Sequence, residues 1–147
     1  MSQARLFRSA LLVAFVAMTA MVAGCARPHH EARRPQERTV FVERDRSNGT
    51  TIRIRVGDQV ALILSSTYWN VRGSAAPTVL RQDGPAKLLG SPSSCPPGVG
   101  CGSLRTFFTA LTPGTAMITA HRDSCGEALR CVGSRGRFRL TVIVTQT

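Results

Sequence analysis

The sequence has a single lysine, few aromatic residues and no apolar run long enough to cross a membrane. Of its 147 residues, 19 are basic and 8 are acidic, and Lys87 is the only lysine. The other basic residues are arginines scattered along the chain, whereas nucleic-acid-binding tails are blocks of Lys and Arg. Aromatic residues make up 5% of the chain, too few for the stacking platforms that bind single strands. The composition therefore predicts no nucleic-acid partner, despite a formal net charge of +11.

The first 24 residues have the organisation of a bacterial lipoprotein signal. Met1–Ala10 carries two arginines and no acidic residue, and a mostly apolar stretch follows from Ala10 to Ala23. This stretch has the length of a secretory h-region and is shorter than the roughly 20 residues of a membrane-spanning helix. It ends in Val-Ala-Gly-Cys, which resembles a lipobox, whose cysteine becomes the lipidated N-terminus. The sequence predicts a signal helix over residues 1–24, lipid on Cys25, and an extracytoplasmic protein anchored to the cell membrane.

The segment that follows the lipobox has the composition of a flexible linker. Residues 25–38 have no apolar periodicity and are rich in charge, as expected of a solvated spacer. His29 and His30 lack further ligands at a fixed spacing, so we expect no metal site there. The one folded domain is therefore predicted at residues 39–147.

Short alternating runs indicate that this domain is all-β. In Thr51–Val56 and Arg137–Val144, apolar residues alternate with polar or charged ones, and turn residues bound each run. The pattern predicts an antiparallel β-sandwich or barrel. The predicted strands are Thr39–Glu43, Thr51–Val56, Gln59–Leu64, a strand from Leu104, Ala116–Arg122 and Arg137–Val144.

Two connections are predicted to be hairpins. Residues 47–49 turn the first strand toward the second. Because a two-residue turn there would set Val42 opposite Arg55, we expect a wider loop or a bulge. Leu104–Arg122 is the second predicted hairpin, with its turn at residues 112–114.

Four cysteines remain in the domain, and three pairings are open to them. We favour Cys95–Cys101 and Cys125–Cys131, because each closes a short loop of small residues and disulfides are expected outside the cytoplasm. Each bridge then contributes on the order of 2 kcal/mol. The alternative is a zinc site in which His121 joins the cysteines, but the spacing is longer than zinc ligand pairs use. We therefore predict no metal and no cofactor.

The two cysteine-bridged loops are expected at the same end of the sandwich. Ser91–Ser103 and Asp123–Gly136 flank the predicted hairpin, so both lie opposite its turn. Ser65–Trp69 follows a strand that ends at Leu64 and is expected to reach that end too. Rigid loops clustered at one end of a sandwich are typical of recognition.

Parts of the domain resemble the chagasin-type inhibitors of papain-like cysteine proteases. The resemblance is carried by Val56–Val60, by Thr67–Trp69, and by Gly98–Arg122 with its Gly-rich loop, F-x-A-L run, Pro-Gly and final arginine. It implies an immunoglobulin-like sandwich in which three loops enter the protease cleft. Two departures stand out: Ser65-Ser66 occupies the place of Asn-Pro, and Asp-Ser-Cys follows Arg122 in place of Pro-Trp.

The resemblance assigns binding to specific loop residues. A lone tryptophan in a sandwich more often packs in the core than contacts a partner, so we favour the core for Trp69. The implied binding residues are Thr67, Tyr68, Trp69, Gly98, Gly100, Gly102 and Arg122.

Two further function classes compete with an inhibitor. One is an envelope module that binds another envelope protein, or anionic wall polymer through arginines on outward-facing strand positions, namely Arg53, Arg55, Arg137 and Arg139. The other is an enzyme, which we do not expect. His121, Asp123 and Ser124 are neighbours at a strand end and cannot converge as a triad, and paired cysteines leave no nucleophilic thiol.

Overall fold

The computed structural model describes residues 37–90, 93–126 and 128–146. The predicted signal helix, Cys25 and nearly all of the linker lie outside the described residues. One compact unit runs from Arg34 to Thr147 and contains every described strand and both disulfides. We therefore expect this unit to fold as an independent domain. Among the described residues, no helix is both long and apolar enough to cross a membrane.

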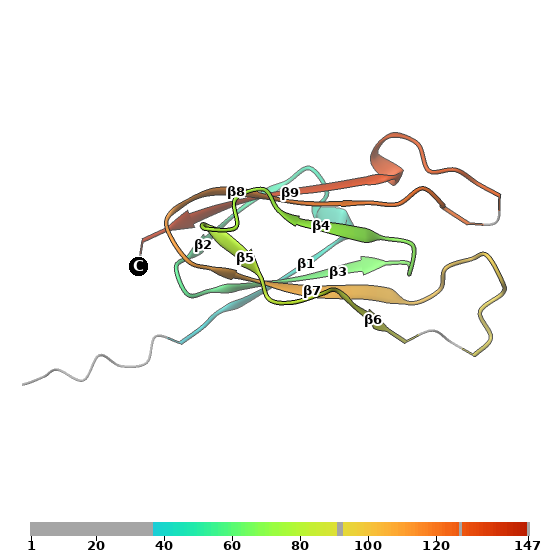
Figure 1. The fold of residues 1–147 in the computed structure, drawn as a ribbon, viewed down its shortest axis with the longest axis horizontal. Coiled ribbons are helices and arrows are strands. Elements are labelled where there is room, and N and C mark those ends of the chain that lie inside the picture. Colours follow the sequence, from blue (N-terminus) through green and yellow to red (C-terminus); the bar gives the residue numbers. More distant parts are fainter. Residues whose placement is uncertain (1–36, 91–92, 127, 147) are drawn as a thin grey trace, which may run out of the picture. The chain divides into compact units, whose positions relative to one another are not determined.

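The domain is an immunoglobulin-like β-sandwich of two sheets (Figure 1). In the first sheet the order is β1-β3-β7-β5, and β6 also pairs with β7. In the second sheet the order is β2-β9-β8-β4. The strands are β1 (Val40–Arg44), β2 (Thr51–Arg55), β3 (Gln59–Ser65), β4 (Asn70–Ser74), β5 (Leu80–Gln82), β6 (Lys87–Leu89), β7 (Ser103–Ala110), β8 (Gly114–His121) and β9 (Arg137–Thr145).

Period-two alternation explains why these segments form strands. Along β7 and β9 every second residue is buried, and the others face outward. The buried sets of the two sheets meet in one core. Its fully buried side chains include Val60, Leu62, Leu64, Leu80 and Phe108 from the first sheet and Ile118, Phe138, Leu140 and Val142 from the second.

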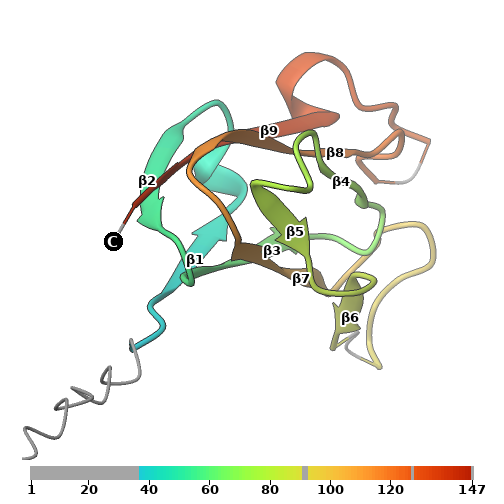
Figure 2. The same cartoon turned by 60° about the vertical axis from the view of Figure 1, so that its left-hand side comes forward.

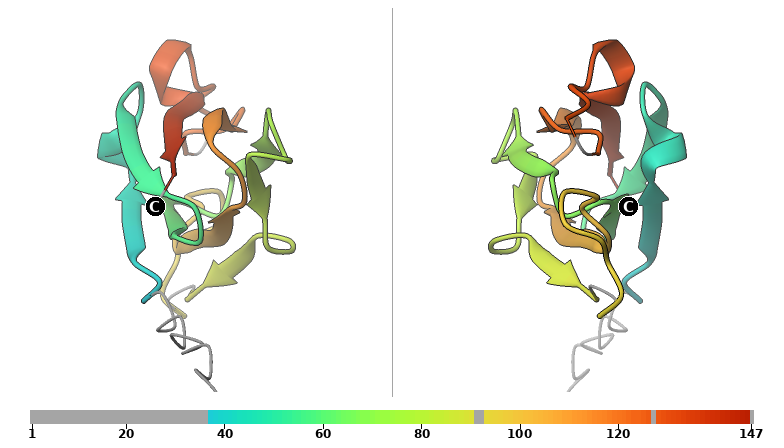
Figure 3. Two further views of the ribbon diagram at one scale, coloured as in Figure 1. Left: turned by 90° about the vertical axis from the view of Figure 1, so that its left-hand side faces the viewer. Right: turned by 90° about the vertical axis from the view of Figure 1, so that its right-hand side faces the viewer.

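Both predicted hairpins are wrong, because each pair of strands is divided between the two sheets. β1 pairs in parallel with β3, and β2 pairs in parallel with β9, so both sheets are mixed rather than purely antiparallel. β7 and β8 also lie in opposite sheets, and their orange connection passes from one layer to the other (Figures 2 and 3). Each strand has one apolar face, and crossing lets consecutive strands bury these faces against each other from opposite sides.

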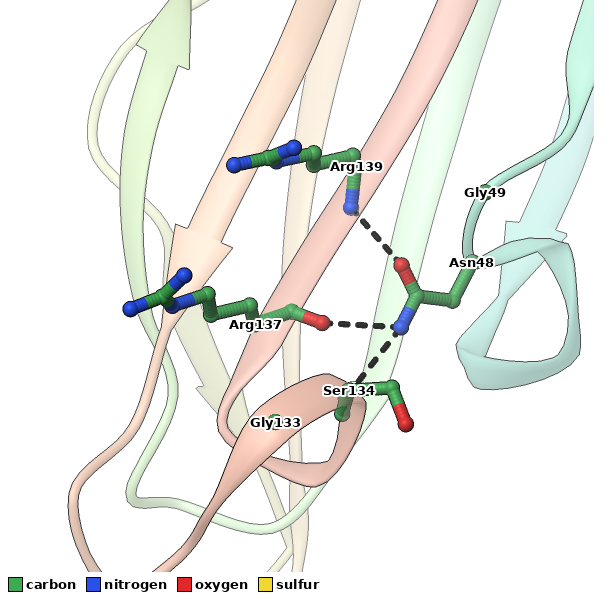
Figure 4. Close-up of a pocket in the computed structure, with 6 residues that line it drawn as sticks. All are labelled: Asn48, Gly49, Gly133, Ser134, Arg137 and Arg139. Atoms are coloured by element: carbon green, nitrogen blue, oxygen red, sulfur yellow. Dashed lines mark hydrogen bonds between the residues drawn. The ribbon is translucent and has the colours of Figure 1, made fainter.

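The Asn48 side chain holds the crossing between β1 and β2. Its Oδ1 accepts the Arg139 backbone N–H at 2.9 Å, and its Nδ2 donates to the carbonyls of Arg137 at 2.8 Å and Ser134 at 3.2 Å (Figure 4). Gly49 N–H donates to the Arg139 carbonyl at 2.7 Å. Residues 48 and 49 therefore dock on the start of β9 instead of closing a hairpin.

The chain enters the domain at one end of the strands, and the predicted loops leave from the other. Thr39 N–H donates to the Asp58 carboxylate at 3.1 Å, at the turn between β2 and β3. β3 runs from that turn to Ser65, which pairs with Ser103 at the start of β7. The residue pair His121 and Arg137, where β8 ends and β9 begins, brackets the third loop.

Candidate functional site

Hydrogen bonds join the first and second loops. Ser66 N–H donates to the Gly102 carbonyl at 2.9 Å, and Thr67 N–H donates to the Gly100 carbonyl at 3.0 Å. These bonds extend the pairing of β3 and β7 beyond the sheet. Ser66 has a φ of 113°, a conformation that costs a non-glycine residue on the order of 1–3 kcal/mol and that clusters at functional loops.

Two glycines allow the close approach of these loops. A Cβ on Gly100 would lie 2.4 Å from the Tyr68 ring, so the ring packs directly over the backbone of the second loop. A Cβ on Gly102, where φ is +107°, would lie 2.3 Å from the Gly90 carbonyl oxygen. The Gly-rich pattern that carried the resemblance therefore has a local cause: side chains have no room where the loops meet.

Trp69 is buried in the core and contacts both Ser65 of the first loop and Arg122 at the start of the third loop. Its side chain is 6% exposed and belongs to the core, the placement that the sequence favoured. Its Nε1–H donates to the Ser65 carbonyl at 3.2 Å. Above it, the Arg122 guanidinium lies 4.5 Å from the ring centroid in a cation–π contact.

Arg122 ties the third loop to the first. Its Nε donates to the Arg135 carbonyl at 2.9 Å, and its Nη1 donates to the Ser65 carbonyl at 3.4 Å. Because the same guanidinium also lies over Trp69, one side chain contacts the core, the first loop and the third loop. The structure thus brings together the three loops that the sequence placed at one end.

Both predicted local disulfides are present, one in the second loop and one in the third. Cys95 and Cys101 have Cα atoms 5.8 Å apart, and Cys125 and Cys131 have Cα atoms 5.1 Å apart. The zinc alternative is wrong for this structure, because its four cysteine sulfurs form two disulfide bonds.

The exposed apolar side chains of the site lie where the sequence did not point. In the second loop Val99 is 44% exposed, and in the third loop Leu129 is 52% and Val132 is 64% exposed. Sequence reasoning missed them because it sought anchors among aromatic residues. A large apolar residue within a short disulfide-bridged loop would have predicted them, because such a loop offers no core position that could bury the side chain.

His121, Asp123 and Ser124 do not form a triad. His121 contacts Arg72, whose Nε donates to Nδ1 at 3.2 Å, and Ser124 Oγ donates to the Gly126 carbonyl at 3.1 Å. Within the described parts of the chain, no group of three or more His, Cys, Asp or Glu side chains is arranged to hold a metal ion.

The four arginines predicted at outward-facing strand positions fall into two groups on the outer face of the second sheet. All four arginines are exposed, as predicted. Arg137 and Arg139 lie at the loop end, whereas Arg53 pairs with Ile143 and Arg55 with Thr145 at the far end of β9. Arg72 and His121 lie beside Arg137 and Arg139, and the sequence pattern did not assign either of them to this face.

Solved structures of other proteins have a similar fold. No protein-family model matches the sequence, and no curated protein matches it either. EhICP2, a cysteine protease inhibitor from Entamoeba histolytica, matches with a TM-score of 0.54 at 9% identity, covering 76% of this chain and 100% of its own. The chain shares the fold of a cysteine protease inhibitor. Amebosin also matches, with a TM-score of 0.51 at 19% identity, covering 74% of this chain and 100% of its own.

Proposed function

We propose that this domain inhibits papain-like cysteine proteases by inserting its three joined loops into the substrate cleft. The observation that carries the proposal is the set of bonds between the loops: backbone bonds fix Ser66 and Thr67 to the second loop, and Arg122 fixes the third. The fold shared with EhICP2 supports the same class of function. The catalytic cysteine is blocked by occupancy of the cleft, and no covalent step is needed.

Preorganisation is what makes these loops suited to an inhibitor. A loop that orders only on binding loses affinity to conformational entropy. Here two disulfides, inter-loop hydrogen bonds and the Trp69 support hold the backbone before the partner arrives. In this proposal Thr67, Tyr68 and the Gly98–Gly102 backbone contact the cleft, and Val99 and Leu129 supply exposed apolar area.

Inhibition of papain by the Arg34–Thr147 unit tests the proposal directly. We expect inhibition at submicromolar concentration, measured as residual hydrolysis of a fluorogenic peptide. The double variant Val99→Asp, Leu129→Asp should weaken inhibition by about a hundredfold, because it places two charges on surfaces that become buried.

Val42→Asp is the matched control for that variant. Val42 is 50% exposed on β1, away from the loops, so its variant should inhibit papain like the unchanged domain. Absence of inhibition by the folded, oxidised domain at about 10 µM, a concentration at which even a weak specific complex forms, would refute the proposal.

We propose further that lipid on Cys25 holds the domain at the outer surface of the bacterial cell membrane. Residues 26–38 reach at most roughly 45 Å when fully extended. The chain enters the domain near Asp58, at the opposite end from the loops, which supports a tether that leaves the loops accessible to a protease.

Replacing Cys25 by serine tests the anchor. In cells, the natural chain should label with palmitate and sediment with membranes, and Cys25→Ser should do neither, because a serine at this position removes the thiol that the lipid is attached to. Cys125→Ser serves as the control, since it removes a cysteine without touching the anchor. Palmitate incorporation that persists in Cys25→Ser would contradict the prediction.

A further inference from the structure

The strands of the second sheet carry arginine but no acidic residue of their own. Its four strands, β2, β4, β8 and β9, contain five arginines and no Asp or Glu. In the described part of the chain, the one Arg–carboxylate ion pair joins Arg81 and Asp83, and Arg81 belongs to the other sheet. Arg72, Arg137 and Arg139, whose common hollow contains no acidic residue, are therefore available to an external anion.

Three of these arginines border a single hollow at the loop end of that face. The hollow has a volume of about 210 Å³ and is lined by residues of β4, β8 and β9. Figure 4 shows the guanidinium groups of Arg137 and Arg139 on the opposite side of β9 from Asn48. The residues that border the hollow with side-chain donors are Arg72, Thr119, His121, Arg137 and Arg139.

Arg72 is held in place by two features. The register of β4 against β8 shifts between Val71 and Gly73, so Arg72 is the bulged residue, and bulges re-aim side chains. Its guanidinium lies against the His121 imidazole, with Nε donating to Nδ1 at 3.2 Å and Nη2 3.3 Å from Nε2. A guanidinium fixed this way loses less entropy when it binds an anion.

We propose that this hollow binds a phosphate group of a flexible anionic polymer. Three guanidinium groups from two strands suit an anion with three or more acceptor oxygens, whereas a carboxylate is satisfied by a single arginine fork. The Arg139 partner across the ladder, Thr119, adds a hydroxyl. The outward-facing positions of these strands carry no Phe, Tyr or Trp to stack a base, and the one imidazole, that of His121, lies against Arg72, so recognition is of the phosphate itself.

The second arginine group indicates a polymer rather than a flat surface. Arg53 pairs with Ile143, four residues beyond Arg139 on β9 and so about 13 Å further along the strand. Sheets twist by roughly 20–25° from strand to strand, so a flexible chain can follow both groups where a flat bilayer cannot. Two described hollows bring carboxylates near these arginines: Asp123 shares one with His121 and Arg137, and Glu37 and Asp58 share one with Arg53 and Arg55.

Calorimetric titration of the full chain in neutral detergent with short linear polyphosphate tests the proposal. Arg72→Gln with Arg139→Gln should weaken binding by about tenfold or more, because two charge-assisted contacts are lost. Arg53→Gln with Arg55→Gln removes the same charge from the same face and should weaken binding by about threefold or less. Arg72→Lys with Arg139→Lys keeps the charge but loses the planar fork, and should fall between the two.

Each alternative gives a distinct result. Equal losses from the two glutamine pairs would mean unspecific attraction to a charged face and would overturn the site. Polyglutamate that binds as tightly as polyphosphate would overturn the phosphate preference. Tighter binding to phosphatidylglycerol vesicles than to polyphosphate would assign the face to a membrane and overturn the polymer. All substitutions lie on exposed strand positions, so unchanged melting temperatures are expected throughout.

Discussion

Replacing Trp69 by alanine is expected to lower the free energy of unfolding of the Arg34–Thr147 unit by about 3–5 kcal/mol, the range for large-to-small core changes. The indole is 6% exposed within the core, and its removal leaves a cavity beneath the loops. It also removes the Nε1–H bond to the Ser65 carbonyl and the ring under the Arg122 guanidinium. Denaturant unfolding followed by far-UV circular dichroism measures the change, since Trp69 is the only tryptophan.

Trp69→Phe is the matched control. It keeps an aromatic ring in the core and under Arg122 but cannot donate to Ser65, so we expect a smaller loss of about 1–2 kcal/mol. A loss below about 1 kcal/mol from Trp69→Ala would contradict the core role. Because the ring is buried, the folded Trp69→Phe variant should still inhibit papain. Inhibition abolished in a folded Trp69→Phe domain would instead make the indole a direct contact.

The strands could be predicted because the information for them is local. Alternation along Thr51–Val56 and Arg137–Val144 reflects which side faces the core, and β2 and β9 end within a residue of those runs. The short edge strands β4, β5 and β6 gave no such signal. β4 contains a bulge, and β5 and β6 have three residues each, too few for a period to show.

Strand pairing could not be predicted, because it depends on distant residues. Asn48-Gly49 is a strong local hairpin signal. In the fold, the Asn48 amide instead bonds the backbone of Arg137 and Arg139, about ninety positions away in the sequence. The same holds for β7 and β8: the turn between them is compatible with a hairpin, and only burial against the opposite layer decides that the chain crosses.

The position of the loops at one end of the sandwich could be predicted from strand direction more than from sequence motifs. Since β7 and β8 run in opposite directions, the loops before β7 and after β8 share an end whether or not the strands pair. Contacts such as Arg122 over Trp69, or Arg72 against His121, join residues that no local pattern relates. These contacts depend on the folded arrangement of distant segments, so the sequence alone does not predict them.

Replacing Gly102 by alanine is expected to have the second large effect, and it acts on the loops directly. Gly102 has a φ of +107°, where an L-residue is strained by about 1–2 kcal/mol. In addition, its Cβ would lie 2.3 Å from the Gly90 carbonyl oxygen and 3.2 Å from Thr67 Cγ2, so backbone has to move. Together these effects should lower the free energy of unfolding by about 2–4 kcal/mol.

The same substitution should weaken papain inhibition by about tenfold or more, even under conditions where the variant is folded. The Gly102 carbonyl accepts the Ser66 N–H at 2.9 Å, so a shifted backbone loosens the junction of the first and second loops and restores the entropy cost of ordering them.

Gly84→Ala separates backbone strain from the close approach of the loops. Gly84 has a φ of +91°, nearly that of Gly102, but nothing lies within 4 Å of the Cβ it would carry, and it sits between β5 and β6. It should cost only about 1–2 kcal/mol of stability and leave papain inhibition unchanged. If Gly102→Ala and Gly84→Ala reduced stability equally and both inhibited normally, the tight contact between the loops would have no part in the activity.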